Sequence, residues 1–307
     1  MSEHIIKIGT RGSKLALWQA NYVADLLKKG GVNTEILIIE TKGDKILDVT
    51  IGNIGGKGVF TEEIEEQLLL KNIDIAIHSA KDMPSELPSG LELLAFTDRE
   101  KVNDVVIGNI DLTQQKEWLV GTSSTRRVAF LKHFYPHVRT IAVRGNLQTR
   151  IRKMQDGQCD GLLLAFAGVH RMGYDEMITH VLPSEEFTTP AGQGSIAIEV
   201  SNHLPDEKKQ LIYQLVNHRN TELCVRAERA FLKTMHGGCS IPVFVYASIV
   251  GEQLHINGGI VSLDGKNMVR KSISGNLNNF VELGEGLAKQ VLECGGREIL
   301  EKIKMAN

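Results

Sequence analysis

The stretch IIKIGTRGS at residues 5–13 indicates most directly how this chain folds. Its first half is an apolar run that predicts a strand, and the small polar residues at 9–13 interrupt that strand. Apolar residues then recur at helical spacing until Gly30-Gly31, where a helix is expected to end. The apolar residues on that helix are Leu15, Trp18, Tyr22 and Leu26. A strand that leads through a Gly- and hydroxyl-rich turn into a helix is typical of α/β folds, and such a turn offers backbone N–H groups to an anion.

A second junction of the same kind begins at Val120. The stretch VGTSS at residues 120–124 resembles IGT at residues 8–10, and each precedes a predicted helix. This likeness predicts two similar lobes around a cleft, although such junctions are common enough in α/β folds for chance to explain it. Short apolar runs alternate with amphipathic stretches elsewhere, so the expected architecture is α/β with mainly parallel sheets. The further strands are expected at residues 34–40, 73–77 and 195–200, with a helix at about 61–71.

After about Asn217 the pattern changes to that of a separate α+β domain. A helix over residues 222–235 is expected to end at Gly237-Gly238. Three strand-like runs follow, and the Asp264-Gly265 pair between the last two is a hairpin signal. The sequence therefore predicts a small three-stranded antiparallel sheet. The expected segments are strands near 241–250, 253–262 and 267–274 and a final helix near 279–293.

The 307 residues carry a formal net charge of −2, and that charge is unevenly distributed. Between Gly121 and Arg171 there are nine basic residues and two acidic ones, so this segment carries +7 and the remainder of the chain carries −9. Arginine predominates in the segment, and its planar guanidinium group suits carboxylate or phosphate. The asymmetry favours an anionic ligand held by this segment, and a solvated basic face is the alternative.

Several protein classes are disfavoured by composition. No stretch reaches the roughly 18 apolar residues of a membrane span, and the N-terminus lacks the basic-then-apolar layout of a signal peptide. We therefore expect a cytoplasmic protein that does not bind membranes. The cysteines are widely spaced with no C-x-x-C pair, so neither a metal site nor a disulfide framework is expected. They are Cys159, Cys224, Cys239 and Cys294.

Two glycine-rich motifs fail the tests for nucleotide sites. The loop GNIGGKG at residues 52–58 has Ile51 and Gly58 where the Walker spacing needs glycine and a hydroxyl residue. The triplet Gly192-Gln193-Gly194 follows no predicted strand and precedes one, which is the reverse of the dinucleotide-binding context. Nucleic-acid binding is also disfavoured, because only 5% of the residues are aromatic and stacking platforms are scarce.

Two residues are candidates for chemistry by their context. Cys239 follows a predicted helix end and a Gly-Gly pair, so it is expected in a loop where His236 could help to form the thiolate. A packed and inert thiol is the alternative. Asp82 lies just beyond the predicted strand at 73–77, where α/β proteins place ligand groups, although many such aspartates cap a turn.

Six short segments, in order and at matching spacing along nearly the whole chain, resemble the porphobilinogen deaminase family. They are IGTRGSKLA (8–16), GGKG (55–58), HSAKDMP (78–84), GTSSTRR (121–127), RGNLQTR (144–150) and GGCS (237–240). One departure is PAGQG at residues 190–194, where the family usually has another residue between alanine and glycine.

The resemblance implies three domains, of which the first two resemble the lobes of a periplasmic binding protein and enclose the active site. The expected divisions are residues 1–99 with 194–217, residues 100–193 as the arginine-rich lobe, and residues 218–307. The resemblance also implies a transferase of porphyrin and heme biosynthesis. In this family the loop cysteine, here Cys239, holds a dipyrromethane cofactor through a thioether. Four porphobilinogen units are added head to tail with loss of ammonia, and hydrolysis then releases hydroxymethylbilane.

The resemblance further implies which residues bind and react. Each pyrrole ring carries an acetate and a propionate, so cationic and hydroxyl side chains are expected around the growing chain. The implied binding residues are Arg11, Ser13, Lys57, Lys81, Thr122, Ser123, Ser124, Arg126, Arg127, Arg144, Arg150 and Arg171. Asp82 is implied as the catalytic residue, a buried carboxylate that stabilises the positive charge left by ammonia and moves protons. No metal or nucleotide is needed, and a monomer is expected.

Two alternatives from other functional classes stay open at the level of sequence. A non-catalytic small-anion-binding protein of the same two-lobed architecture would explain the arginines, but it leaves the third domain and the Gly-Gly-Cys loop without a purpose. A hydrolase with a cysteine nucleophile is the other alternative, and labelling with a thiol-directed ester substrate would reveal it.

Overall fold

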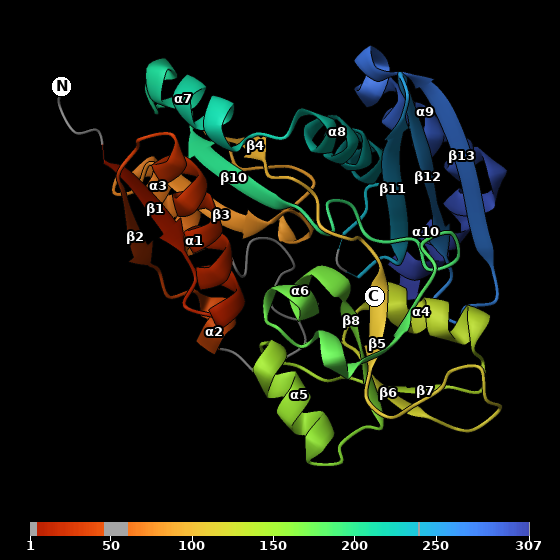
Figure 1. Ribbon diagram of the computed structural model, residues 1–307. Helices are drawn as coiled ribbons and strands as arrows, with labels where there is room; N and C mark the ends of the chain where they lie inside the picture. Colours follow the sequence, from red (N-terminus) through yellow and green to blue (C-terminus); the bar gives the residue numbers. More distant parts are fainter. Residues whose placement is uncertain (1–4, 46–60, 239, 307) are drawn as a thin grey trace. The chain divides into compact units, whose positions relative to one another are not determined.

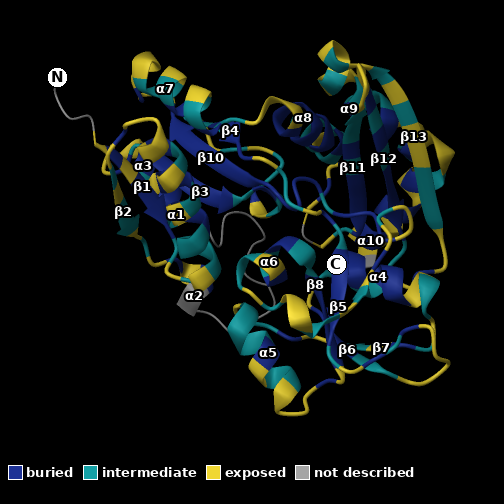
Figure 2. Cartoon of the chain, in the orientation of Figure 1, coloured by how far each residue is buried: buried dark blue, intermediate teal, exposed yellow. Residues whose placement is uncertain are grey.

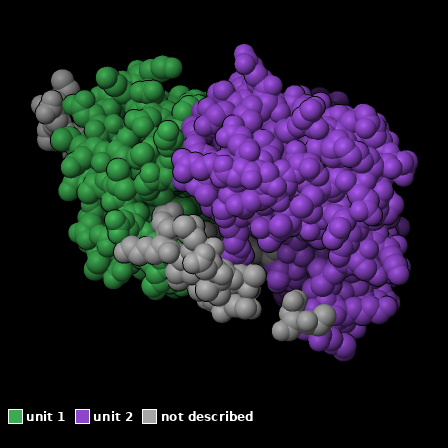
Figure 3. Space-filling model, turned by 90° about the horizontal axis from the view of Figure 1, so that it is seen from below, with its two compact units in different colours: residues 1–100, 194–222 green, residues 101–193, 223–307 purple. Residues whose placement is uncertain are grey.

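The computed structural model describes residues 5–45, 61–238 and 240–306, and the chain divides into two compact units (Figure 3). Unit 1 comprises Met1–Glu100 and Gly194–Glu222, and unit 2 comprises Lys101–Gln193 and Leu223–Asn307. The chain therefore leaves unit 1, returns to it and leaves it again. Within the described ranges, no helix combines the length and the apolar character that a bilayer crossing requires.

Unit 1 is built on one five-stranded mixed sheet with the order β2-β1-β3-β10-β4 (Figure 1). Strand β1 pairs in parallel with β2 and with the central strand β3, whereas β10 is antiparallel to β3 and β4. Every residue of β10 is buried, as Figure 2 shows by its dark blue colour. The strands are β1 (Ile6–Thr10), β2 (Thr34–Ile38), β3 (Ile75–Ser79), β4 (Leu91–Phe96) and β10 (Ile196–Ser201).

Helix α1 (Lys14–Lys29) follows β1 at the predicted junction. Ser13 caps its first turn, since the Ser13 hydroxyl accepts a hydrogen bond from the Ala16 N–H at 3.3 Å, and Gly30 forms its C-cap. The predicted apolar residues are half-buried, and the most buried face of the helix lies beside them. That face consists of Gln19, Ala20, Val23, Ala24 and Leu27. The other helices of unit 1 are α2 (Lys42–Lys45), α3 (Glu62–Leu69) and α7 (Asp206–Val216).

Unit 2 begins with a second five-stranded sheet of the same design, in the order β7-β6-β8-β5-β9. Strand β6 is parallel to β7 and to the central strand β8, and β5 is antiparallel to β8 and β9. The strands are β5 (Asp104–Ile107), β6 (Leu119–Gly121), β7 (Arg139–Ile141), β8 (Gly161–Ala165) and β9 (Ile178–Val181). The helices are α4 (Thr125–Phe134), α5 (Leu147–Gln155) and α6 (Phe166–Arg171). The prediction of two similar lobes is thus confirmed.

Both sheets are mixed, whereas the sequence predicts mainly parallel ones. Half of the strand pairings in each sheet are antiparallel. In each sheet a single strand makes both antiparallel pairings. In unit 1 it is β10, which belongs to the segment that returns to this unit. In unit 2 it is β5, which precedes the parallel strands β6, β7 and β8 in the chain. The apolar pattern predicts the strand at 195–200 that became β10, but it carries no information about strand direction, and β5 was not among the predicted strands.

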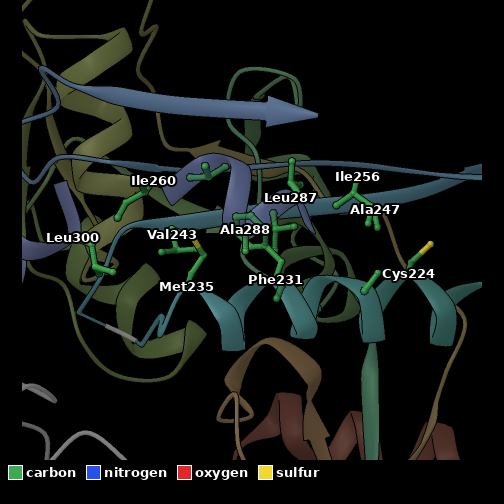
Figure 4. Close-up of a cluster of buried hydrophobic side chains, with 14 of the residues drawn as sticks. Cys224, Phe231, Met235, Val243, Ala247, Ile256, Ile260, Leu287, Ala288 and Leu300 are labelled. Carbon is green, nitrogen blue, oxygen red and sulfur yellow. The ribbon is translucent and has the colours of Figure 1, made fainter. Parts of the chain in front are cut away.

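The remainder of unit 2 is the predicted α+β part. Strands β11 (Val243–Val250), β12 (Gln253–Val261) and β13 (Met268–Asn276) form an antiparallel sheet in that order. Helices α8 (Arg219–Thr234) and α9 (Phe280–Val291) contribute Phe231 and Leu287 to the buried core of this part (Figure 4). A last helix, α10 (Arg297–Ala306), was not predicted, and it follows a kink at which Gly295 has a φ of 104°.

The two sheets of unit 2 share an aromatic cluster. Phe244 of β11 lies 5.0 Å from Phe130 of α4, measured between ring centroids, and Phe130 lies 5.2 Å from Phe187. All three rings are fully buried. Glu228 of α8 adds a polar connection, because its carboxylate accepts the N–H groups of Gly192 and Ala247 at 2.7 and 2.8 Å. Unit 2 therefore packs as one body.

We predict that Phe244→Ala lowers the free energy of unfolding by about 3–5 kcal/mol, because it removes a fully buried ring that joins two sheets. Urea denaturation followed by circular dichroism measures this change. The matched control is Val250→Ala on the same strand, where the side chain is 66% exposed and the expected change is within about 0.5 kcal/mol. Equal losses in both variants would contradict the shared cluster.

Candidate active site

In unit 1 the predicted site residues follow two neighbouring parallel strands. Arg11 and Ser13 follow β1, and Lys81 and Asp82 follow β3 in the short 3-10 helix η2 (Ala80–Asp82). Because the carboxyl ends of parallel strands meet at the same edge of a sheet, these residues share one edge of the unit 1 sheet. The Gln19 amide donates to the Ser79 hydroxyl at 2.9 Å and so connects α1 to the end of β3.

Asp82 is exposed, although the family resemblance implies a buried carboxylate. Its backbone is nevertheless well anchored. The neighbours Ala80 and Met83 are both buried, and the Ala80 N–H donates to the carbonyl of Ser195 at 3.0 Å, which continues the β3–β10 ladder. A rigid backbone therefore presents a carboxylate that a ligand can reach.

In unit 2 the predicted residues follow three parallel strands. Thr122, Ser123 and Ser124 follow β6, and Ser124 caps α4 by accepting the Arg127 N–H. The Ser123 hydroxyl donates to the carbonyl of Val143, just beyond β7, at 3.0 Å. These hydroxyl groups and the N-terminus of α4 lie at the carboxyl edge of the sheet. Such an edge suits an anion.

Three further arginines lie around the same edge of unit 2. Arg144 follows β7, and Arg150 lies on α5, where its Nε donates to the carbonyl of Gly145 at 2.8 Å. Arg171 ends α6, the helix after β8. All three side chains are half-buried. The structure thus gathers this part of the predicted basic segment at the end of one parallel set of strands.

Arg126 and Arg127 lie deeper, and both are paired with Asp104. The Asp104 carboxylate accepts from Arg126 at 2.6 Å and from Arg127 at 2.7 Å, and all three side chains are buried. Each arginine also donates to a backbone carbonyl, that of Thr188 or of Leu163, at 2.9 and 3.0 Å. Although burial alone raises the pKa of Asp104, the two arginine charges and their hydrogen bonds hold it well below its usual range.

Asp104 was not among the residues predicted from the sequence to bind a ligand. It begins the strand segment DVVI at residues 104–107, and an acidic residue at the start of an apolar strand usually lies in solvent. Only two features taken together could have identified it: an acidic residue in an otherwise apolar strand, and two adjacent arginines at the start of a helix. Such residues fit a buried ion pair.

The Arg126–Asp104–Arg127 cluster fits a further anion. Two guanidinium groups against one carboxylate leave a net charge of +1 in a buried place, and the Nε–H groups of Arg126 and Arg127 are buried without a hydrogen-bond partner. Unpaired buried donors are costly, and a ligand carboxylate would balance the charge and accept such donors. The residues present therefore suit a ligand that carries carboxylates.

Two predicted site residues, Lys57 and Cys239, lie outside the described residues, as does the GGKG segment at 55–58. The prediction that Cys239 lies in a loop therefore stays a prediction, and in the chain it falls between α8 and β11. The other three cysteines are free thiols, buried at positions 159 and 224 and exposed at position 294. Burial raises the pKa of the Cys159 thiol, which disfavours the reactive thiolate there.

Comparisons with known proteins show which family the whole chain resembles. Residues 6–209 match a family described as "Porphobilinogen deaminase, dipyromethane cofactor binding domain", and residues 222–293 match "Porphobilinogen deaminase, C-terminal domain". A porphobilinogen deaminase from Desulfosudis oleivorans is 50% identical over 303 residues, which cover 97% of this chain and 98% of the relative. One from Cytophaga hutchinsonii is 52% identical over 302 residues, which cover 97% of each chain. Among solved structures, a TRAP periplasmic solute binding protein from Desulfovibrio salexigens is similar with a TM-score of 0.43 and 12% identity, covering 70% of this chain and 73% of that chain.

We predict that Asp104→Asn lowers the free energy of unfolding by about 3–5 kcal/mol, because it leaves two buried arginine charges uncompensated. In the wild type the low pKa of Asp104 makes its contribution complete above the ordinary value of 3.8, and the contribution is lost as the pH falls below it. Urea denaturation over a pH series measures both effects.

The control for this prediction is Asp156→Asn, at an exposed position of the same unit. Asp156→Asn should have the same free energy of unfolding as the wild type at neutral pH, and this free energy should decrease in acid as it does in the wild type. An Asp104→Asn variant with unchanged stability at neutral pH would show that the arginines find other partners.

Proposed function

The chain belongs to the porphobilinogen deaminase family, and from that premise we propose that Cys239, Asp82 and the arginine-rich edge of unit 2 carry the separate parts of its reaction. The reaction is a transfer: four porphobilinogen units are condensed head to tail, with loss of ammonia, onto a cysteine-linked dipyrromethane, and hydrolysis releases hydroxymethylbilane. The observation that carries this conclusion is the identity of 50% to a relative of that name over 97% of the chain.

Substrate binding is assigned to the cationic and hydroxyl side chains at the two sheet edges. Each pyrrole unit brings an acetate and a propionate, and guanidinium groups bind carboxylates through paired hydrogen bonds. The proposed residues in unit 1 are Arg11, Ser13, Lys57 and Lys81. Those in unit 2 are Thr122, Ser123, Ser124, Arg126, Arg127, Arg144, Arg150 and Arg171. The net positive charge and unpaired Nε–H groups of Arg126 and Arg127 support this assignment.

Cofactor attachment is assigned to Cys239. When bound, the dipyrromethane supplies a pyrrole ring whose free α-carbon accepts the next unit. The cysteine contributes the thioether sulfur, and it lies in the chain between α8 and β11. The buried cysteines at positions 159 and 224 are poor candidates, because they lack access to solvent.

Catalysis is assigned to Asp82. Loss of ammonia from the aminomethyl group of porphobilinogen leaves a cation, and a carboxylate beside the pyrrole N–H stabilises that charge. In its protonated form the same group can donate a proton to the departing amine, and the carboxylate that results can accept the proton that the attacking α-carbon releases. The anchored backbone of η2 supports both roles, because it fixes the carboxylate while leaving it accessible. A bound substrate would exclude water from it and strengthen the interaction.

We also propose an oligomeric state, a compartment and a domain division for the enzyme. A monomer in the cytoplasm is proposed, with three domains at residues 1–99 with 194–217, 100–193 and 218–307. The free thiols at the three described cysteines are consistent with a reducing compartment. Light scattering coupled to size exclusion measures the oligomeric state.

We predict that the denatured intact mass of the purified enzyme exceeds the chain mass by two porphobilinogens less two ammonias, and that Cys239→Ser lacks this excess because a thioether needs sulfur. The matched control is Cys294→Ser, at an exposed cysteine, which should keep the excess. Retention of the mass in Cys239→Ser would move the attachment to another cysteine. If incubation with porphobilinogen added nothing to the mass of an unmodified chain, the proposed function would be wrong.

We predict that Asp82→Asn folds and binds porphobilinogen but loses about 10²–10⁴-fold in kcat, with KM much less affected, because the amide neither balances a cation nor exchanges a proton. Steady-state kinetics on the cofactor-loaded variant measures this. Asp25→Asn, at an exposed position of α1, is the control and should match the wild type. A kcat close to that of the wild type in Asp82→Asn would remove Asp82 from the reaction.

A further inference from the structure

A cluster of three titratable side chains is buried in unit 1 just before the Asp82 segment. His78 Nε2 of β3 lies 3.1 Å from Glu199 Oε2 of β10, and these side chains are 6% and 0% exposed. Glu65 of α3, 5% exposed, faces both of them. The cluster therefore joins the helix α3 to two neighbouring strands. None of the three residues belongs to the binding or catalytic set proposed above.

Two carboxylate oxygens of the cluster have no hydrogen-bond donor among the described residues. They are Glu65 Oε1 and Glu199 Oε1, and both are buried. The hydroxyl of Thr61 is buried beside Glu65 and favours the charged form of that carboxyl. Buried oxygens of this kind are costly when a charged carboxylate carries them. A proton on one carboxylate would supply a donor and remove one of the charges.

The charges point to Glu65 as the group that holds this proton. Even with His78 protonated, two ionised glutamates leave the cluster with a net negative charge in the interior. Glu199 already has the imidazole as its partner. The charged groups that face Glu65 are Glu199 from β10, His78 from β3 and Glu62 from its own helix. Burial raises the pKa of Glu65, and the two neighbouring glutamates raise it further against the opposing effects of Thr61 and His78.

The position of the cluster connects it to the reaction. His78 is followed directly by Ser79 and η2, and the His78–Glu199 pair lies across the β3–β10 ladder that continues to the Ala80 N–H. We infer that Glu65 is a neutral acid at physiological pH, and that with this proton in place His78, Glu199 and Glu65 are positioning residues that hold the end of β3 so that Asp82 is correctly presented. The second part of this inference rests on the role of Asp82 proposed above.

The inference fixes the sign of a pH dependence. The folded protein keeps a proton on Glu65 that the unfolded chain releases at the ordinary glutamate pKa of 4.5. The free energy of unfolding therefore falls as the pH rises from 4.5 to the raised pKa, and it changes no further from this source above it. Loss of the proton places a second negative charge against Glu199, which loosens the end of β3 and lowers kcat on the alkaline side.

The test compares Glu65→Gln with Glu66→Gln, an exposed glutamate on the same helix. Glutamine is isosteric with the neutral acid, so Glu65→Gln should lose the pH slope of stability contributed by Glu65, whereas Glu66→Gln should keep it. Infrared spectroscopy of the folded wild-type enzyme at neutral pH should show a carbonyl band of a protonated carboxylic acid that is absent in Glu65→Gln and present in Glu66→Gln. An unchanged slope and spectrum in Glu65→Gln would overturn the inference.

Kinetics tests the positioning role. Glu65→Gln should keep kcat within about twofold of the wild type at neutral pH and retain it at alkaline pH, while Glu65→Ala should lose kcat at every pH with a smaller change in KM. If Glu65→Gln carries the spectroscopic change but the pH profile of its kcat equals that of the wild type, the positioning role is wrong. The stability and infrared measurements repeated in an Asp82→Asn background keep the two proposals apart, because they do not depend on whether Asp82 is catalytic.

Discussion

The carboxylate of Asp104 receives side-chain donors from three residues that lie far from it along the chain. Arg126 and Arg127 come from the first turn of α4, and Gln193 donates at 2.9 Å from the end of the segment that leads back to unit 1. Since α4 begins with two adjacent arginines that are both buried, it needs a buried anion at that place. Asp104 of strand β5 supplies this anion. Its ion pairs hold the start of α4, and the hydroxyl residues that precede α4, against the sheet.

Unit 1 has buried carboxylates in a different electrostatic setting. Asp104 is balanced by more positive than negative charge, so it stays ionised and its surroundings can accept a further anion. Glu65 and Glu199 share a single imidazole, so their surroundings can accept a further proton. The same side-chain chemistry thus prepares one place for a carboxylate ligand and another for a neutral acid, and the count of neighbouring charges makes the difference.

The two five-stranded sheets show why the paired junctions need glycine. A Cβ atom at Gly9 would lie 2.3 Å from the side chain of Ile73, and one at Gly121 would lie 2.6 Å from that of Leu162. In both sheets a side chain at this position would therefore have to displace the packed side chains of neighbouring strands and loops, which glycine avoids. The likeness between IGT and VGTSS reflects this shared constraint, and it places Ser13 and Ser124 at the starts of α1 and α4.

Local structure and the chemistry of individual positions could be predicted from the sequence. Apolar residues predicted a strand just before Asp82, helical periodicity predicted α1 and α8, and the charge asymmetry predicted that the segment from Gly121 to Arg171 holds an anionic ligand. Which strands and which charged side chains pair with one another follows from the tertiary structure alone. The directions of β5 and β10, the Asp104 ion pairs across 22 and 23 positions, and the meeting of His78 with Glu199 across 121 positions all depend on chain closure over long separations. Periodicity reports which face of an element is buried, but it holds no information about the element that covers that face, and buried acids such as Asp104 and Glu199 look in the sequence like any exposed acid.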